Sequence, residues 1–140
     1  MAEKESFITK LEKGRAEFAY RCVEEAKQTF QGESKKQKEY KSYVKKIPSM
    51  VLSNGLGQTL AFVKAKSERG NAYDLIYKQL TEYMKSNHTT RISMPQDEDD
   101  LVRWVISENS EKYRYITQEI LAFLQWLKRF AEGLIEEEEE

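Results

Sequence analysis

Apolar side chains recur every three or four positions along almost the whole chain, the spacing that places them on one side of an α-helix. No segment alternates apolar and polar residues as a half-buried strand does. Proline, which interrupts helices, occurs only at Pro48 and Pro95. The sequence therefore predicts an all-α protein. Because 140 residues match the size of one domain and no segment repeats, we expect a single domain.

About six helices are expected from the residues that end them. Glycines that follow an apolar run, such as Gly32, Gly55 and Gly70, are typical of helix ends. The expected helices cover residues 4–30, 36–54, 56–67, 72–86, 101–107 and 110–135. Pro48 is expected to bend or divide the second helix.

The first and last expected helices are long enough to span a domain of this size, at a rise of about 1.5 Å per residue. We therefore expect them to lie side by side in an elongated bundle formed by residues 1–135. The five glutamates at 136–140 are expected to form a solvated acidic tail.

Several chemistries are excluded because the chain has one cysteine, Cys22, and one histidine, His88. A disulfide within the chain needs two cysteines, and a structural zinc site normally needs four Cys or His ligands. The acidic run 97–100 indicates a helix start with Asp97 as N-cap. It does not fit a calcium loop, which needs a glycine at its sixth position. We expect no catalytic residues, no metal, no cofactor and no small-molecule substrate.

The chain has no stretch that approaches the roughly 18 apolar residues of a membrane helix. Its charged beginning, MAEKESFITK, lacks the apolar core of a signal peptide. We therefore expect a cytoplasmic protein without membrane contact.

Positive charge is concentrated in the first half of the chain. Residues 1–70 contain 15 Lys or Arg against 9 Asp or Glu, whereas residues 71–140 contain 8 against 15. A positive surface on a protein whose net charge is only −1 suits phosphate backbones or acidic partners.

A row of lysines, Lys38, Lys41 and Lys45, follows one face of the second expected helix. A helical wheel places this row opposite the apolar stripe that contains Tyr40 and Val44. Such a row can neutralise phosphates without reading bases, although a solvated helix face is the alternative interpretation. Further cations nearby favour binding, and the predicted phosphate contacts are Lys38, Lys41, Lys45, Lys46, Lys64 and Lys66.

The run Asn54-Gly55-Leu56-Gly57 does not fit a phosphate loop, because no strand precedes it and no Gly-Lys-Ser/Thr follows. It predicts a helix end and a tight corner. The next helix has Gln58 in its first turn, and its N-terminus is expected to accept one phosphate through backbone N–H groups.

Arg15 lies within the apolar stripe of the first expected helix. Burying a guanidinium is costly unless it is paired. Glu119 lies at the edge of the last helix's stripe, so we hypothesise a structural Arg15–Glu119 ion pair.

Residues 40–66 read YKSYVKKIPSMVLSNGLGQTLAFVKAK, which closely resembles the signature segment of the small subunit of the Cmr complex, the type III-B CRISPR effector. Residues 72–77 (AYDLIY), 117–120 (TQEI) and 124–132 (LQWLKRFAE) are similar as well. The resemblance spans nearly the whole chain in order, and residues 87–107 carry least of it.

The resemblance implies a non-catalytic, α-helical subunit, several copies of which are present in each antiviral complex. In that family the small subunits stack head to tail into a filament beside the backbone subunits that hold the guide RNA, and the target RNA runs between the two. Its implied partners are the other subunits, copies of itself and the guide or target RNA. The lysines above and Gln58 would then contact RNA.

A free-standing helical adaptor that binds acidic protein partners is the alternative function. It would use the same positive surface without RNA. Co-purification with a complex that contains guide RNA distinguishes the two.

Overall fold

The computed structural model describes residues 6–86 and 92–136 of the chain. Within these ranges the chain forms one domain of six α-helices and no strand, which confirms the all-α prediction. The helices are α1 (Phe7–Thr29), α2 (Ser34–Asn54), α3 (Leu56–Lys66), α4 (Ala72–Lys85), α5 (Leu101–Ser107) and α6 (Ser110–Leu134). His88 and most of the acidic tail lie outside the described residues.

Side-chain caps begin three of the helices. Ser6, Asn71 and Asn109 each accept a hydrogen bond from the backbone N–H three residues later. Such a cap satisfies one of the backbone donors that the first turn of a helix leaves without a partner. The N-cap of α5 is Asp100 and not Asp97 as expected, because Asp97 lies in a turn and the helix begins only at Leu101.

Helix α2 continues through Pro48 without being divided. Proline removes one backbone hydrogen bond from a helix, which favours a break. Here the residues on either side of Pro48 are buried, Ile47 before it and Val51 after it, and Pro48 is buried as well. Packing around the proline therefore keeps the two halves in one continuous helix.

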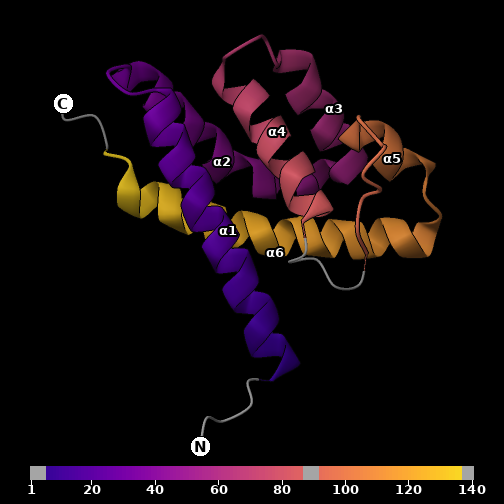
Figure 1. Cartoon of the computed structure of the whole chain (residues 1–140). Coiled ribbons are helices and arrows are strands. Elements are labelled where there is room, and N and C mark those ends of the chain that lie inside the picture. The colour runs from indigo at the N-terminus through magenta and orange to yellow at the C-terminus, as the bar shows by residue number, and fades with distance from the viewer. Residues whose placement is uncertain (1–5, 87–91, 137–140) are drawn as a thin grey trace, which may run out of the picture.

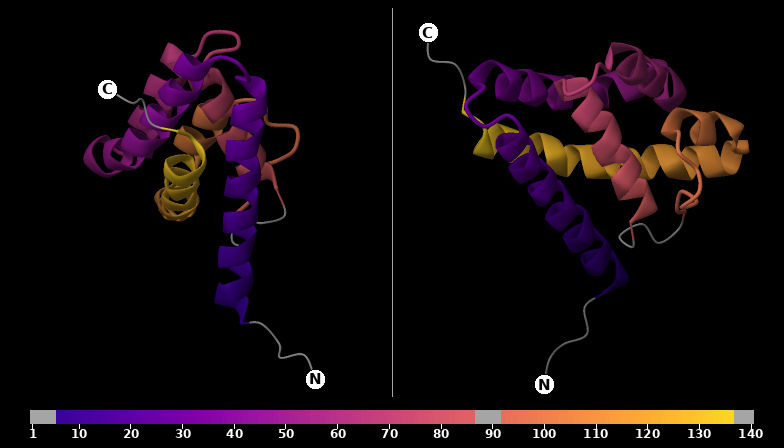
Figure 2. Two further views of the ribbon diagram at one scale, coloured as in Figure 1. Left: turned by 90° about the vertical axis from the view of Figure 1, so that its left-hand side faces the viewer. Right: turned by 45° about the horizontal axis from the view of Figure 1, so that its top comes forward.

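The two long helices cross instead of lying side by side. Figure 1 shows α1 running across α6, with the first turns of α1 extending beyond the rest of the molecule, and in the left view of Figure 2 α1 is seen lengthwise while α6 is seen nearly end-on. The expected arrangement was wrong because α6 also packs against α2 and α5. Those contacts leave α1 only part of the length of α6 to cover.

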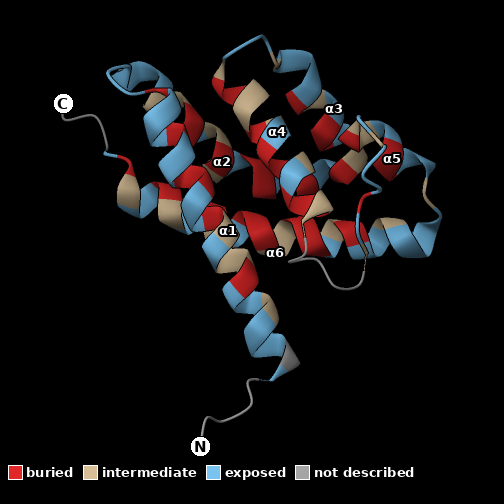
Figure 3. Ribbon diagram, in the orientation of Figure 1, coloured by how far each residue is buried: buried red, intermediate tan, exposed pale blue. Residues whose placement is uncertain are grey.

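All six helices contribute buried positions to the core, as Figure 3 shows, and one group of aromatic rings lies where α1, α4 and α6 meet. Tyr83 stacks on Phe123, with ring centroids 4.1 Å apart, and Phe18 meets both rings edge-on. Aromatic pairs in these geometries are worth about 0.5–1.5 kcal/mol beyond the area that they bury. The three rings therefore fix how these helices are placed relative to one another.

A buried amide connects α4 to α1 and α2. Gln79, only 1% exposed, accepts a hydrogen bond from the Tyr40 hydroxyl at 2.6 Å. Its Nε2 atom donates to the Cys22 carbonyl and to the Glu25 carboxylate, each at 2.8 Å. Burial raises the pKa of Tyr40 well above its usual value, so the phenol stays protonated and able to donate.

None of the helices in the described part of the chain is both long enough and apolar enough to cross a membrane.

Replacing Gln79 tests this network. Gln79→Leu leaves the buried Tyr40 hydroxyl without an acceptor, which should lower the free energy of unfolding by about 1–3 kcal/mol. Adding Tyr40→Phe removes the orphaned hydroxyl, so the double variant should be more stable than Gln79→Leu alone. Urea unfolding followed by circular dichroism measures both, and additive losses would contradict the network.

Candidate nucleic-acid interface

Lys41 does not belong to an exposed row of lysines. Its side chain is 5% exposed, and its Nζ atom donates to the Ile135 carbonyl at 2.9 Å. That carbonyl lies directly after the last turn of α6, where the helix dipole attracts cations. The prediction that Lys41 offers its ammonium to phosphates is therefore wrong, because its charge binds the end of α6.

The reason is that α2 is buried on more than the expected stripe. It packs against α3, α4 and α6 at once. A second line of buried residues runs along the helix at the i, i+3, i+7 spacing and consists of Lys41, Val44 and Pro48. Lys41 and Pro48 lie within about 20° of each other on a helical wheel, and this was the signal in the sequence for the burial of Lys41.

Lys46 lies on a group of aromatic rings contributed by three helices. Its Nζ atom is 5.0 Å from the ring centroid of Tyr43 (α2), 5.8 Å from that of Phe62 (α3) and 5.7 Å from that of Tyr73 (α4). Lys66 adds a second ammonium, 5.9 Å from the Phe62 ring. We call these five residues the lysine–aromatic cluster.

The rings of the cluster hold one another in place. Tyr43 and Tyr73 stack with centroids 3.9 Å apart, and Phe62 meets Tyr73 edge-on at 5.8 Å. The Tyr43 hydroxyl donates to Glu39 at 3.0 Å. Burial and this bond raise the pKa of Tyr43, so its ring stays neutral. Ammonium groups are attracted to such ring faces by about 0.5–1 kcal/mol at exposed sites.

Both ammonium groups of the cluster face solvent. Lys46 and Lys66 are exposed, and neither has a carboxylate partner among the residues that the structure describes. The rings position these two cations without neutralising them. The cluster therefore presents two cations that no carboxylate of the described residues neutralises.

Lys64 points to another part of the molecule. Its Nζ atom lies 2.5 Å from Asp100 at the start of α5, and Asp100 also accepts a hydrogen bond from the Tyr77 hydroxyl at 2.5 Å. Burial alone would raise the pKa of Asp100, but the bonds from Lys64 and Tyr77 outweigh it and hold the pKa below its usual value. Lys64 thus pairs α3 with α5.

The residues predicted to bind phosphate are divided among separate surfaces. Lys38 lines a depression beside Ile135 and Glu136, close to the end of α6. Lys45 is half-buried on α2. Gln58 is exposed and lines a hollow with Phe62, which also contacts Lys46 and Lys66. Lys46 and Lys66 therefore adjoin the Phe62 ring, which lines the same hollow as Gln58.

Sequence reasoning missed the aromatic half of the cluster. Tyr43, Phe62 and Tyr73 are far apart in the sequence and lie on three helices, so only the packing of α2, α3 and α4 brings them together. Lysine residues three or four positions from Tyr43 and Phe62 were the one local signal.

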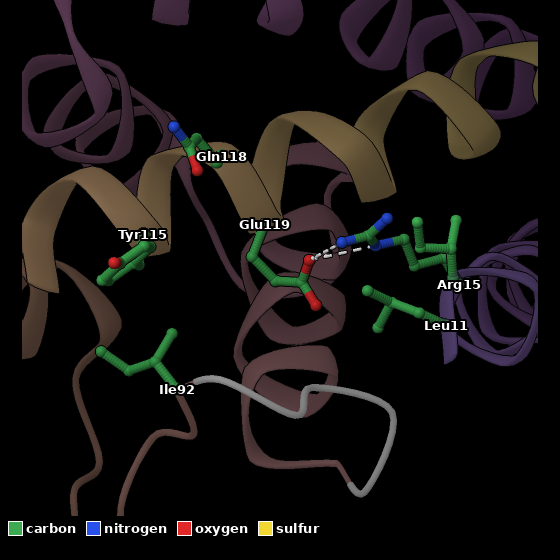
Figure 4. Close-up of a pocket in the computed structure, with 7 residues that line it drawn as sticks. Leu11, Arg15, Ile92, Tyr115, Gln118 and Glu119 are labelled. Atoms are coloured by element: carbon green, nitrogen blue, oxygen red, sulfur yellow. Dashed lines mark hydrogen bonds and ion pairs between the residues drawn. The ribbon is translucent and has the colours of Figure 1, made fainter. Parts of the chain in front are cut away.

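Arg15 and Glu119 form the ion pair that the sequence suggested. The Arg15 side chain reaches from α1 to Glu119 on α6, as Figure 4 shows, and its Nε atom donates to Glu119 Oε2 at 3.0 Å. The other Glu119 oxygen accepts a hydrogen bond from the Tyr83 hydroxyl at 3.2 Å. Burial and the Glu119 charge raise the pKa of Tyr83, which keeps this donor protonated. The carboxylate therefore connects α1, α4 and α6.

The chain matches the sequence model of one protein family, described as CRISPR-associated protein (Cas_Cmr5), over residues 11–134. It is 28% identical over 120 residues to the CRISPR system Cmr subunit Cmr5 of Thermus thermophilus. That similarity covers 86% of this chain and 94% of the relative.

The fold is similar to a crystal structure of a CRISPR-associated Cmr5 family protein, also from Thermus thermophilus. The two have a TM-score of 0.68 and 27% sequence identity, over 90% of this chain and 97% of the other.

Arg15→Met tests the ion pair. It should lower the free energy of unfolding by about 3 kcal/mol, because it leaves the buried Glu119 carboxylate without its cation. Arg21→Met is the matched control: Arg21 lies on the same helix but is exposed, so its loss should stay within about 1 kcal/mol. Equal losses in urea unfolding would show that the pair contributes nothing specific.

Proposed function

The chain belongs to the Cas_Cmr5 family, the small subunits of the type III-B CRISPR (Cmr) effector complex. We propose that within this complex it lines the path of the guide or target RNA without catalysing a reaction. In this role the subunit supplies positive charge and a rigid helical scaffold. Sequence is read by pairing between guide and target, so contacts to the RNA backbone are sufficient.

The lysine–aromatic cluster is the observation that carries this proposal. It presents two exposed ammonium groups, at Lys46 and Lys66, over rings that restrict their motion. A lysine that is already held in place loses less side-chain entropy when it binds a phosphate. Each such contact releases counterions and adds affinity that does not depend on sequence.

The other lysines that the sequence predicted to contact RNA lie outside the lysine–aromatic cluster. Lys45 is half-buried on α2, and its contact with RNA remains a prediction. Lys38 and Lys64 lie beside α6 and α5, and their contacts with RNA remain predictions. Lys41 has no part in RNA binding.

Contacts with other subunits, including copies of itself, form the second part of the proposal. Large apolar side chains are exposed at Ile8 in α1, Leu52 in α2 and Ile106 in α5, at 69%, 73% and 65%. Together with the unequal charge of the two halves of the chain, they suit heterologous contacts, in which different patches meet and the assembly stays open-ended. Such contacts would support a filament of small subunits, which we expect to act in the cytoplasm.

The double variant Lys46→Gln/Lys66→Gln tests RNA binding. For single-stranded RNA, the slope of log affinity against log salt concentration should become shallower by about 1.4, or about 0.7 for each lost phosphate contact. Fluorescence anisotropy with labelled RNA at several salt concentrations measures it.

Lys41→Met is the control for this experiment, because it removes a lysine of the same helix whose charge faces α6. It should leave the slope unchanged. A double variant with an unchanged slope would refute the RNA contacts, and a loss of co-purification with partner proteins alone would favour the adaptor function.

A further inference from the structure

A shallow hollow lies where the last turns of α2 meet the first turns of α3. Its lining residues are Met50, Ser53, Asn54, Gln58, Thr59 and Phe62. Phe62 also belongs to the lysine–aromatic cluster, so the hollow and the two exposed ammonium groups share one ring.

The lining combines apolar and amide groups. Met50 and Phe62 are half-buried and present a thioether and a ring. Asn54 and Gln58 are exposed, and neither side-chain amide has a hydrogen-bond partner within the described residues. Thr59 is not available to a ligand as a donor, because its hydroxyl already donates to the Gly55 carbonyl at 2.8 Å.

This combination matches one unpaired nucleotide. A nucleobase has a flat apolar face and a polar edge, and single-stranded RNA is commonly bound by stacking its bases on aromatic side chains. The amides of Asn54 and Gln58 each offer both donors and an acceptor, so they can serve the edge of any base. Lys46 and Lys66, which both contact the Phe62 ring, supply cations for the adjoining phosphates.

We infer that the α2–α3 hollow binds an unpaired nucleobase of RNA against Phe62, while Lys46 and Lys66 bind the neighbouring phosphates. The inference rests on the proposed function and adds that this surface recognises RNA whose bases are unpaired. A duplex keeps its bases stacked and paired, so it reaches only the lysines. The site therefore favours single-stranded over double-stranded RNA.

The test compares an unmodified single strand with a strand of equal length that carries abasic nucleotides, both binding to the full chain at low salt. The unmodified strand should bind roughly tenfold more tightly, as expected when one base stacks on an aromatic side chain. Because the abasic strand changes only the ligand, this comparison does not depend on how any variant folds.

Phe62→Leu should bring the two affinities together, because the base loses the ring on which it stacks, and Gln58→Ala should reduce their difference. Phe130→Leu is the matched control: it makes the same change at a half-buried ring on α6, outside the hollow, and should keep the tenfold preference.

Each contrary outcome has a distinct meaning. Equal binding of the two strands by the unaltered chain, with a salt slope that still depends on Lys46 and Lys66, would overturn the base-binding inference alone. The absence of measurable binding to either strand at low salt would overturn both this inference and the RNA-lining proposal. Loss of partner-protein binding in Phe62→Leu, with the strand preference intact, would assign the hollow to a protein contact.

Discussion

The buried carboxylate of Glu119 sets how three of the helices meet. A charge in this position is tolerated only where partners satisfy it, and Arg15 from α1 and Tyr83 from α4 do so from two sides. Tyr83 is also part of the ring stack with Phe123 and Phe18. The hydrogen bonds and the apolar packing therefore require the same crossing of α1 over α6, and the remaining helices pack around it.

The charged side chains of α2 serve two purposes according to their place on the helix. Lys41 is used internally, since it binds the carbonyl that ends α6. Lys46 is exposed to solvent, and its ammonium group contacts neutral aromatic rings instead of a carboxylate. Because both lysines belong to one rigid helix anchored by Pro48 and its buried neighbours, the exposed charge is held at a fixed position relative to the core.

Local sequence signals predicted most of the fold. The three- and four-residue spacing of apolar side chains and the glycines predicted the helices to within a few residues of their ends. The cost of burying a guanidinium predicted the Arg15–Glu119 ion pair. The crossing of the long helices and the burial of Lys41 did not follow, because both depend on how many neighbours a helix has. A helical wheel shows one apolar stripe clearly, but it does not show that α2 packs against α3, α4 and α6 at once. For the same reason the sequence indicated lysines near residue 46 but not the rings beneath them.

We propose that the surface formed by α2 and α3 faces RNA in the assembled complex. Crosslinking answers this most directly: the complex is assembled on a target RNA that contains 4-thiouridine, irradiated and digested, and the crosslinked peptides are identified by mass spectrometry. We expect crosslinks within residues 34–66 of this subunit. Crosslinks confined to α6, or none on this subunit while the backbone subunits are labelled, would contradict it.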